Sequence, residues 1–255
     1  MQFSSNISYR SMVNTQSIDC KINFTNSITF LGIIIESSLT WKKHNDHINS
    51  KLNSLGYILH SLRFLVSLKI IKQIYTSYVH SVLNYGIIFW GNLSYGRTIF
   101  ITQKRIVRII MKAKARDFCW AMFSKIGILT LYSQYIFSIL IFVVKHKDIF
   151  TFNTELHKIN THHKLGLHVP SVNLTKIQKG VYYSGITLFN SLPLGIKKVA
   201  HNTNKFKHEL KKFVIKSSFY SVEQYMDRDA TYDIGVLLNS IWIEMLHMIL
   251  VFSNN

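Results

Sequence analysis

Apolar side chains recur every three or four residues over much of this chain, which is the spacing of helices that bury one face. The clearest stripe begins near His47, directly after Asp46, whose carboxylate is suited to cap a helix start. Its apolar members are Ile48, Leu52, Leu55, Leu59 and Leu62. The same spacing predicts further helices over residues 71–84, 97–114, 132–147 and 182–190, and around 206–214.

One short stretch before the first helix has the composition of a strand. Residues 28–35 are nearly all apolar or β-branched and predict a buried strand, with Gly32 in its middle to let another backbone approach closely. Residues 20–24 are expected to be either a ragged partner strand or a frayed end. We therefore predict a mainly α fold: a helical bundle with a small N-terminal β element, plus a smaller α C-terminal region.

Changes in composition and hydrophobic periodicity along the sequence also indicate how the chain divides into segments. Residues 148–175 are rich in His, Asn, Thr and Lys without a sustained period, so we predict an irregular connector and a domain boundary there. The remaining segments are a β segment (1–45), the main helical domain (46–147), a C-terminal helical region (176–225) and a tail (226–255).

Two apolar stretches are long enough to cross a bilayer, Ile126–Val144 and Ile234–Phe252. Both contain polar residues, and Glu244 at the centre of a span would cost about 2.5–3.5 kcal/mol on insertion. A buried helix with one solvent-exposed edge explains each stretch better than a transmembrane span does, so we do not expect a membrane partner. The first nine residues are polar and form no secretory leader, which predicts an intracellular protein, either nuclear or cytoplasmic.

Charge is the feature in which the composition departs most from that of an ordinary domain. The sequence has 30 Lys and Arg against 12 Asp and Glu, a formal net charge of +18. Such an excess attracts polyanions or anionic membrane surfaces. Within residues 97–114 and just beyond, cations recur at helical steps opposite the apolar face, with no interleaved acid to pair them. These cations are Lys104, Arg105, Arg108, Lys112 and Arg116. A regular row of cations can follow a phosphate backbone, so we predict nucleic-acid contact there; a merely solvated helix face is the alternative.

The acids and the metal-ligand residue types predict no catalytic or metal site. Polymerases hold two metal ions with clustered carboxylates, but the sequence has no adjacent Asp-Asp pair, and Asp227 and Asp229 are expected in a solvated turn. Zinc spacing is also missing from the most His-rich segment, His157–His168. Cys20 and Cys119 are expected to be free thiols. We therefore expect no polymerase activity, no metal and no cofactor for this chain alone.

Short blocks of sequence, taken in order and spacing, carry a family resemblance. They are Phe30-Leu31-Gly32, Leu83-Asn84-Tyr85-Gly86 with Trp90-Gly91, Gln103-Lys104-Arg105-Ile106-Val107-Arg108, Gly127-Ile128-Leu129-Thr130-Leu131, Phe189-Asn190-Ser191-Leu192-Pro193 and Phe219-Tyr220-Ser221-Val222. Over residues 30–225 the chain resembles the reverse transcriptases of non-LTR retrotransposons, in particular the RNA-directed DNA polymerases of jockey-like mobile elements. It departs from them at Asn160-Thr161-His162, where the family usually has Asn-Thr-Arg.

The resemblance implies a particular part of such an enzyme. Residues 1–45 would be the end of the palm with a primer-grip-like hairpin, residues 46–147 the helical thumb, and Phe30, Leu31 and Gly32 the primer-grip strand of that hairpin. The family's catalytic aspartates and magnesium ligands lie upstream of that strand, so the chain is expected to be catalytically incomplete. The implied partners are RNA or an RNA–DNA duplex, and the missing palm and fingers. A membrane-associated interaction protein and a relic without a selected function are the alternatives.

Overall fold

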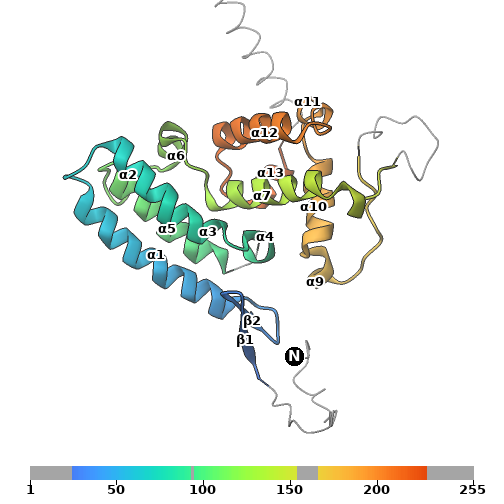
Figure 1. Ribbon diagram of the computed structural model, residues 1–255, viewed down its shortest axis with the longest axis horizontal. Helices are drawn as coiled ribbons and strands as arrows, with labels where there is room; N and C mark the ends of the chain where they lie inside the picture. The colour runs from blue at the N-terminus through green and yellow to red at the C-terminus, as the bar shows by residue number, and fades with distance from the viewer. Residues whose placement is uncertain (1–24, 93–94, 154–165, 229–255) are drawn as a thin grey trace, which may run out of the picture.

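The computed structural model describes residues 25–92, 95–153 and 166–228 of the chain. It is mainly helical with a small two-stranded antiparallel sheet near the N-terminus, which confirms the predicted fold class (Figure 1). The strands are β1 (Ser27–Phe30) and β2 (Ile33–Glu36). The helices are α1 (Lys42–Leu62), α2 (Leu68–Ile74), the π-helix η2 (Tyr75–His80), α3 (Ser81–Asn84), α4 (Ile87–Trp90), α5 (Gly96–Ile110), α6 (Trp120–Ile126), α7 (Leu131–Lys145), the 3₁₀ helix η3 (Lys147–Ile149), α9 (Thr175–Gln178), α10 (Val181–Asn190), α11 (Leu194–Lys198), α12 (Thr203–Ser217) and α13 (Val222–Met226).

Helices α1 and α5 pack side by side and run in the same direction (Figure 1). Thr102 donates a hydrogen bond to Asn49 Oδ1 at 2.6 Å, and a Cβ on Gly56 would lie only 3.3 Å from Ile106. The missing side chain of Gly56 therefore lets the two helices approach closely. The apolar stripe predicted for α1 is buried at Ile48, Leu52 and Leu59, as its spacing requires.

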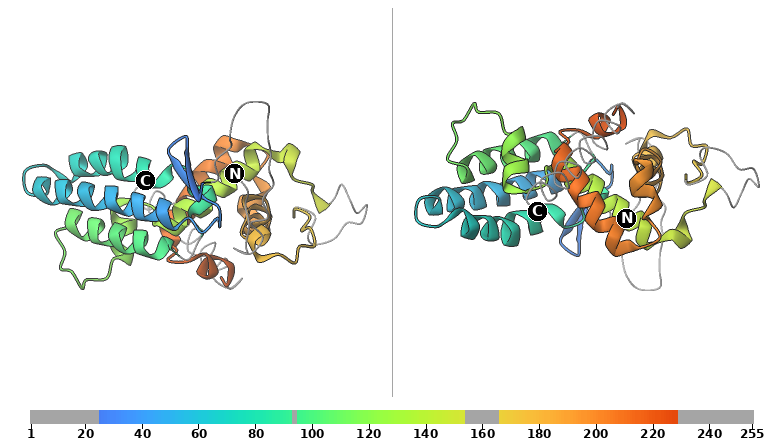
Figure 2. Two further views of the ribbon diagram at one scale, coloured as in Figure 1. Left: turned by 90° about the horizontal axis from the view of Figure 1, so that it is seen from below. Right: turned by 90° about the horizontal axis from the view of Figure 1, so that it is seen from above.

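Helix α7 lies at the centre of the molecule, between the α1–α5 bundle and helices α10 and α12 (Figures 1 and 2). Its start is tied to a distant part of the chain, because Thr130 Oγ1 donates to Phe219 O and Phe219 N donates to Ser133 Oγ at 3.0 Å. Among the described residues, no single helix has the length and apolarity of a membrane span. The bent pair α6 and α7, at 53° to each other, reaches that threshold together by length and composition.

The β element corrects one prediction. Residues 28–35 form two strands of an antiparallel hairpin, with Phe30 paired to Ile33, and not one buried strand. The turn residues Leu31 and Gly32 have φ of 48° and 79°, and positive φ at both central positions is the geometry of tight hairpin turns. The apolar run concealed this turn, because a leucine there gave no turn signal. The tip is also exposed, at 60% for Phe30 and 73% for Leu31.

The start of α1 also differs from the prediction. The helix begins at Lys42, five residues before His47, and Asp46 lies inside it. A carboxylate from the hairpin supplies the first-turn contact that Asp46 was expected to make, since Lys43 N donates to Glu36 Oε2 at 3.4 Å. Only the fold brings Glu36 to that position.

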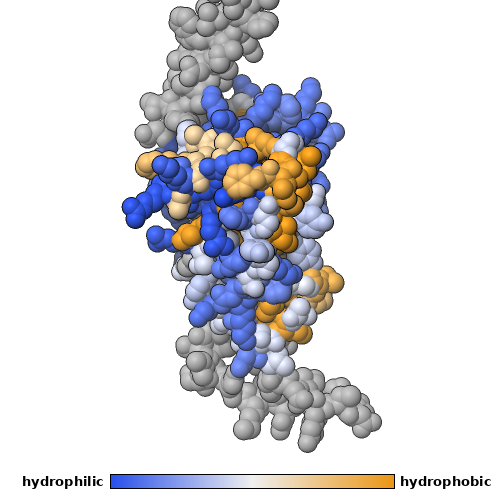
Figure 3. Space-filling view, turned by 90° about the vertical axis from the view of Figure 1, so that its left-hand side faces the viewer, coloured by the Kyte–Doolittle hydropathy of each residue, from blue (hydrophilic) through white to orange (hydrophobic). Residues whose placement is uncertain are grey.

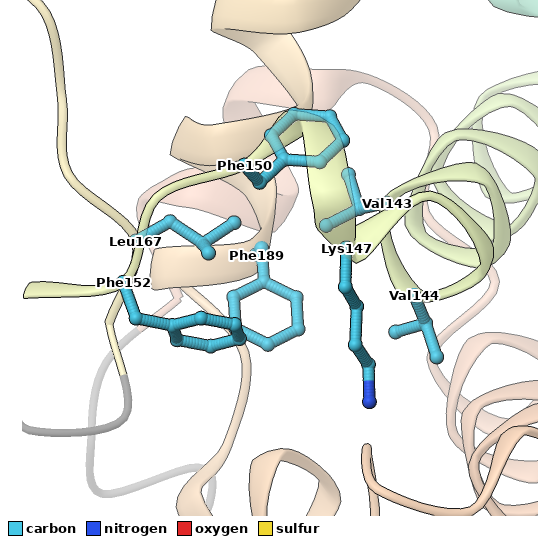
Figure 4. Close-up of a pocket in the computed structure, with 7 residues that line it drawn as sticks. All are labelled: Val143, Val144, Lys147, Phe150, Phe152, Leu167 and Phe189. Atoms are coloured by element: carbon cyan, nitrogen blue, oxygen red, sulfur yellow. The ribbon is translucent and has the colours of Figure 1, made fainter. Parts of the chain in front are cut away.

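The described ends of the predicted connector are packed at a few apolar residues, while residues 148–149, 168–169 and 173–175 are exposed. Phe152 pairs with Leu167 in a β-bridge, and Phe150 and Leu167 are buried. Together with α7 and α10 they enclose an apolar cavity of about 10 Å³, room for roughly one water molecule (Figure 4). The ammonium of Lys147 at its edge donates to Ala200 O at 2.7 Å. This cavity is packing space and not a ligand site. The triplet at 160–162 and the tail from residue 229 lie outside the described residues.

A buried amide on α5 provides a test of what holds these parts together. Gln103 Nε2 donates to Tyr75 Oη at 3.0 Å and Leu129 O at 2.9 Å, and Gln103 Oε1 accepts from Leu131 N at 2.8 Å. Gln103→Ala should lower the free energy of unfolding by about 3 kcal/mol, because it leaves buried polar groups unpaired. Urea unfolding followed by circular dichroism measures this. Exposed Gln73→Ala on α2 is the matched control and should change stability by less than about 0.5 kcal/mol. Equal effects from both variants would contradict the assigned role.

Candidate nucleic-acid interface

An open cleft lies where the hairpin turn meets α1 and α3. Its volume is about 250 Å³, and its lining residues are Gly32, His44, His47, Ile48, Lys51, Ser81, Val82 and Tyr85. Tyr85 closes one side, since its hydroxyl donates a hydrogen bond to Leu31 O in the hairpin turn. The hairpin, the first helix and the end of α3 thus form one site, and its polar wall is α1.

His44 lies at the back of this cleft and is only 2% exposed. Its Nδ1 accepts a long hydrogen bond, 3.4 Å, from Ile34 N, which places the ring proton on Nε2. That Nε2–H group is buried, lacks any hydrogen-bond partner in the structure and belongs to a residue that lines the cleft. The rings of Trp41 and Trp90 hold the imidazole edge-on, at centroid distances of 6.1 and 5.9 Å. The imidazole is therefore held in one orientation by its neighbours, with Nε2 buried.

The electrostatics of the cleft favour a negatively charged ligand. Burial, and to a smaller extent the nearby charges of His47 and Lys51, lower the pKa of His44 to about 4. His44 is consequently neutral at physiological pH and donates without adding charge. Lys51 supplies a full positive charge at the mouth of the cleft.

The row of cations predicted on α5 is not a single face in the structure. Lys104 Nζ lies 4.8 Å from the ring centroid of Phe100, and Arg108 Nε donates to Asp117 O at 2.9 Å. Arg105 points instead toward α1, where it donates to Asn53 Oδ1 at 2.6 Å. All three side chains thus have partners within the protein. The sequence has no acid interleaved with these cations, so it gave no sign of these uncharged partners.

Lys112 and Arg116 are not on the helix at all. Helix α5 ends at Ile110, Lys112 has a φ of 55°, and Ala113 N donates back to Arg108 O at 3.0 Å. This left-handed residue with its backward bond is a common way to end a helix, but a lysine in place of glycine concealed it from the sequence. Both side chains are exposed in the loop that leads to α6. Prediction of a continuous stripe over 97–114 was therefore wrong at its C-terminal end.

The primer-grip-like residues Phe30, Leu31 and Gly32 lie together at the hairpin tip, beside the cleft. Their role stays a prediction. The sequence did contain a signal for the cleft that the prediction missed, since His44, His47, Ile48 and Lys51 are spaced to share one side of α1. What the sequence could not supply is the opposite wall, because Tyr85 comes from a segment far along the chain.

Metal-binding residue types do not cluster in the described part of the chain: no three His, Cys, Asp or Glu side chains come together there. Cys119 is a buried free thiol, and burial raises its pKa. Cys20, His157, His162, His163 and Asp229 lie outside the described residues.

Comparison with protein-family models, with curated proteins and with solved structures gave no match to this chain. Any functional assignment therefore rests on the residues and geometry above.

The buried imidazole predicts a pH dependence of stability. Because the pKa of His44 is about 4 in the folded protein and about 6.5 in an unfolded chain, the unfolded state binds more protons between these values. This contribution to stability is present above pH 6.5 and is lost as pH falls toward 4. We expect His44→Gln, which cannot protonate, to remove about 2 kcal/mol of the stability change between pH 7 and 4.5. Urea midpoints over that range measure it; His60→Gln, an exposed position on α1, is the control. Parallel pH curves for wild type and His44→Gln would contradict the shifted pKa.

Proposed function

We propose that this chain is the thumb and C-terminal part of a non-LTR retrotransposon reverse transcriptase, and that it binds the sugar-phosphate backbone of RNA or an RNA–DNA duplex. The observation that carries the proposal is the cleft beside the hairpin tip, which is lined by the cation Lys51 together with His44, His47 and Tyr85. A phosphate group is a suitable partner for the ammonium of Lys51, because charge-assisted hydrogen bonds to phosphate oxygens are strong.

The form of the site fits a backbone and not a base edge. Its wall is the side of α1 that carries the cation Lys51 and the neutral His44, and phosphate contacts made there contain no sequence information. The exposed hairpin tip projects next to this wall (Figure 1). Binding through this cleft is therefore sequence-tolerant.

The exposed apolar side chains of the hairpin support a second part of the proposal. Ile28 is 48% exposed, and Phe30 and Leu31 are exposed still further. Water contact at neighbouring apolar side chains is unfavourable and marks surfaces that another protein covers. We propose that the palm and fingers of the parent polymerase cover this hairpin.

Catalysis is not part of the proposal, because no adjacent pair of aspartates is present in the sequence to hold two metal ions. The purified chain, incubated with primed template RNA, deoxynucleotides and magnesium, should give no primer extension. A chelator-sensitive extension product, resolved on a denaturing gel and absent from a mock purification, would contradict this assignment.

A salt titration tests backbone binding at the cleft. Each phosphate contact on a duplex contributes about −0.9 to the slope of log K against log salt concentration. Lys51→Ala should therefore weaken binding to a labelled RNA–DNA duplex at low salt and make the slope shallower by about 0.9. Fluorescence anisotropy at salt concentrations between about 50 and 200 mM measures both quantities.

Exposed Lys145→Ala at the end of α7 is the matched control, because it removes the same charge away from the cleft. It should leave the salt slope within error of the wild-type slope. For each variant, the affinity relative to wild type should be the same on unrelated duplex sequences. The proposal is wrong if Lys51→Ala and Lys145→Ala are indistinguishable.

A further inference from the structure

Two loops meet at the end of the α1–α5 pair farthest from the hairpin. One joins α1 to α2 and carries Arg63 and Phe64; the other joins α5 to α6 and carries Lys112. The loops are in contact, since Lys112 Nζ lies 5.0 Å from the ring centroid of Phe64 and the guanidinium of Arg63 lies 4.6 Å from it. We call this region the loop tip and define it as Arg63, Phe64, Lys112, Lys114, Arg116 and Phe118.

The loop tip exposes aromatic rings to solvent to an unusual degree. Phe118 is 93% exposed and Phe64 is 67% exposed, while neighbouring Leu65 is 78% exposed. Figure 3 shows this end of the molecule face on, with hydrophobic side chains lying among strongly hydrophilic ones. Large apolar side chains exposed on two loops that touch each other, at Lys112 and Phe64, indicate an interaction surface.

Charge at the loop tip is positive and nearly unopposed. The two loops contribute Arg63, Lys112, Lys114 and Arg116, and their one acid is Asp117. The carboxylate of Asp117 is engaged in the loop itself, where Oδ2 accepts from Lys114 N at 2.8 Å. Charge complementarity therefore requires an anionic partner.

The α5–α6 loop is held in shape before any partner binds. Arg108 Nε donates to Asp117 O at 2.9 Å, and Asp117 N donates to Lys114 O at 3.2 Å. Together with the carboxylate contact to Lys114 N, these bonds fix the loop that presents Arg116 and Phe118. A preformed loop loses little conformational entropy on binding.

We infer that the loop tip binds single-stranded nucleic acid, with bases stacked on Phe64 and Phe118 and phosphates contacted by the surrounding cations. Interleaved aromatic rings and cations are what single strands require, since unpaired bases stack on rings while the backbone needs positive charge. The inference rests on the proposed function for its choice of nucleic acid as the partner. It adds a second site, for unpaired strand, at the opposite end of α1 from the duplex cleft.

An anionic membrane surface fits the loop tip less well. Inserting the ring of Phe64 into hydrocarbon would draw in Arg63 and Lys112, both within about 5 Å of that ring, and charged groups in a bilayer are costly. A base stacked beside Phe64 leaves the same two cations next to phosphates. The geometry therefore favours a nucleic-acid strand over a lipid surface.

The test uses the full chain and a labelled 12-nucleotide oligouridine, measured by fluorescence anisotropy. Replacing both rings, Phe64→Ala with Phe118→Ala, should weaken binding about 100-fold, because each of the two stacked bases contributes about a 10-fold gain in affinity. Phe64→Trp with Phe118→Trp should keep wild-type affinity or exceed it. The control is Phe89→Ala on α4, another exposed phenylalanine, which should have no effect. Circular dichroism should show an unchanged fold in every variant, since the substituted side chains are exposed.

A second variant tests the cations independently of the rings. Lys112→Gln with Arg116→Gln should make the salt slope on oligouridine shallower by about 1.4, at about 0.7 for each phosphate contact on a single strand. Unchanged oligouridine affinity in the ring variant, or an equal loss in Phe89→Ala, would overturn the inference. So would ring-dependent sedimentation with phosphatidylserine vesicles while oligouridine binding stays intact, because that result would assign the loop tip to membranes.

The same variants separate this inference from the proposed function. The ring variant should keep wild-type affinity for the RNA–DNA duplex, and Lys51→Ala should keep wild-type affinity for oligouridine. If Lys51→Ala weakens duplex binding while the ring variant binds oligouridine normally, the inference falls and the proposed function stands. If wild-type protein binds neither nucleic acid, both fall.

Discussion

The buried side chain of Gln103 is the constraint on which the rest of the structure depends. Its amide joins three separate parts of the chain: the hydroxyl of Tyr75 in η2, the carbonyl of Leu129 before α7, and the first amide of α7 at Leu131. Each of these groups is buried and would be unpaired without it. The amide can make all of these bonds at once only when α5, η2 and α7 lie in one arrangement. Packing around it is therefore specific as well as apolar.

This arrangement determines where the functional surfaces lie. Helix α5 is fixed against α1 by the close approach at Gly56, so Arg105 points toward Asn53 and the loop after α5 comes to rest against Phe64. At the other end of α1, the turn of the hairpin is held by Tyr85, which follows the continuous helix α2–η2–α3. The π-helical segment η2 within that helix contains Tyr75, the partner of Gln103. The same packing thus positions both the cleft and the loop tip.

The two surfaces share a shortage of acids but differ in the groups they present. The cleft combines the neutral His44 in its lining with the charge of Lys51, which suits a single phosphate group. The loop tip combines exposed rings with several cations and suits a strand whose bases are unpaired. Under the proposed function, the chain would meet duplex at one end of α1 and unpaired strand at the other. Among the described residues, the ion pair between Lys212 and Glu209 is exposed and contributes little to holding either surface.

The sequence alone determined the helical character of the chain, since a period of three to four residues and a buried face are local properties of each segment. It also determined the excess of positive charge and the absence of paired aspartates. It did not determine the hairpin turn at Leu31 and Gly32, the start of α1 at Lys42 or the end of α5 at Ile110. In each case a non-glycine residue adopts a left-handed conformation, or a distant carboxylate such as that of Glu36 makes the capping contact.

The functional surfaces depended still more on tertiary structure. Cations at positions 104, 105 and 108 shared one side of a helix in the sequence, yet Lys104 lies over an aromatic ring, Arg105 binds Asn53 and Arg108 binds a loop carbonyl. Whether a charged side chain is available to a ligand depends on what the fold places beside it, and those neighbours come from distant parts of the chain. For the same reason the sequence did not predict the cleft. The spacing of residues along α1 indicates one wall, but only folding brings Tyr85 and the hairpin turn to the opposite side.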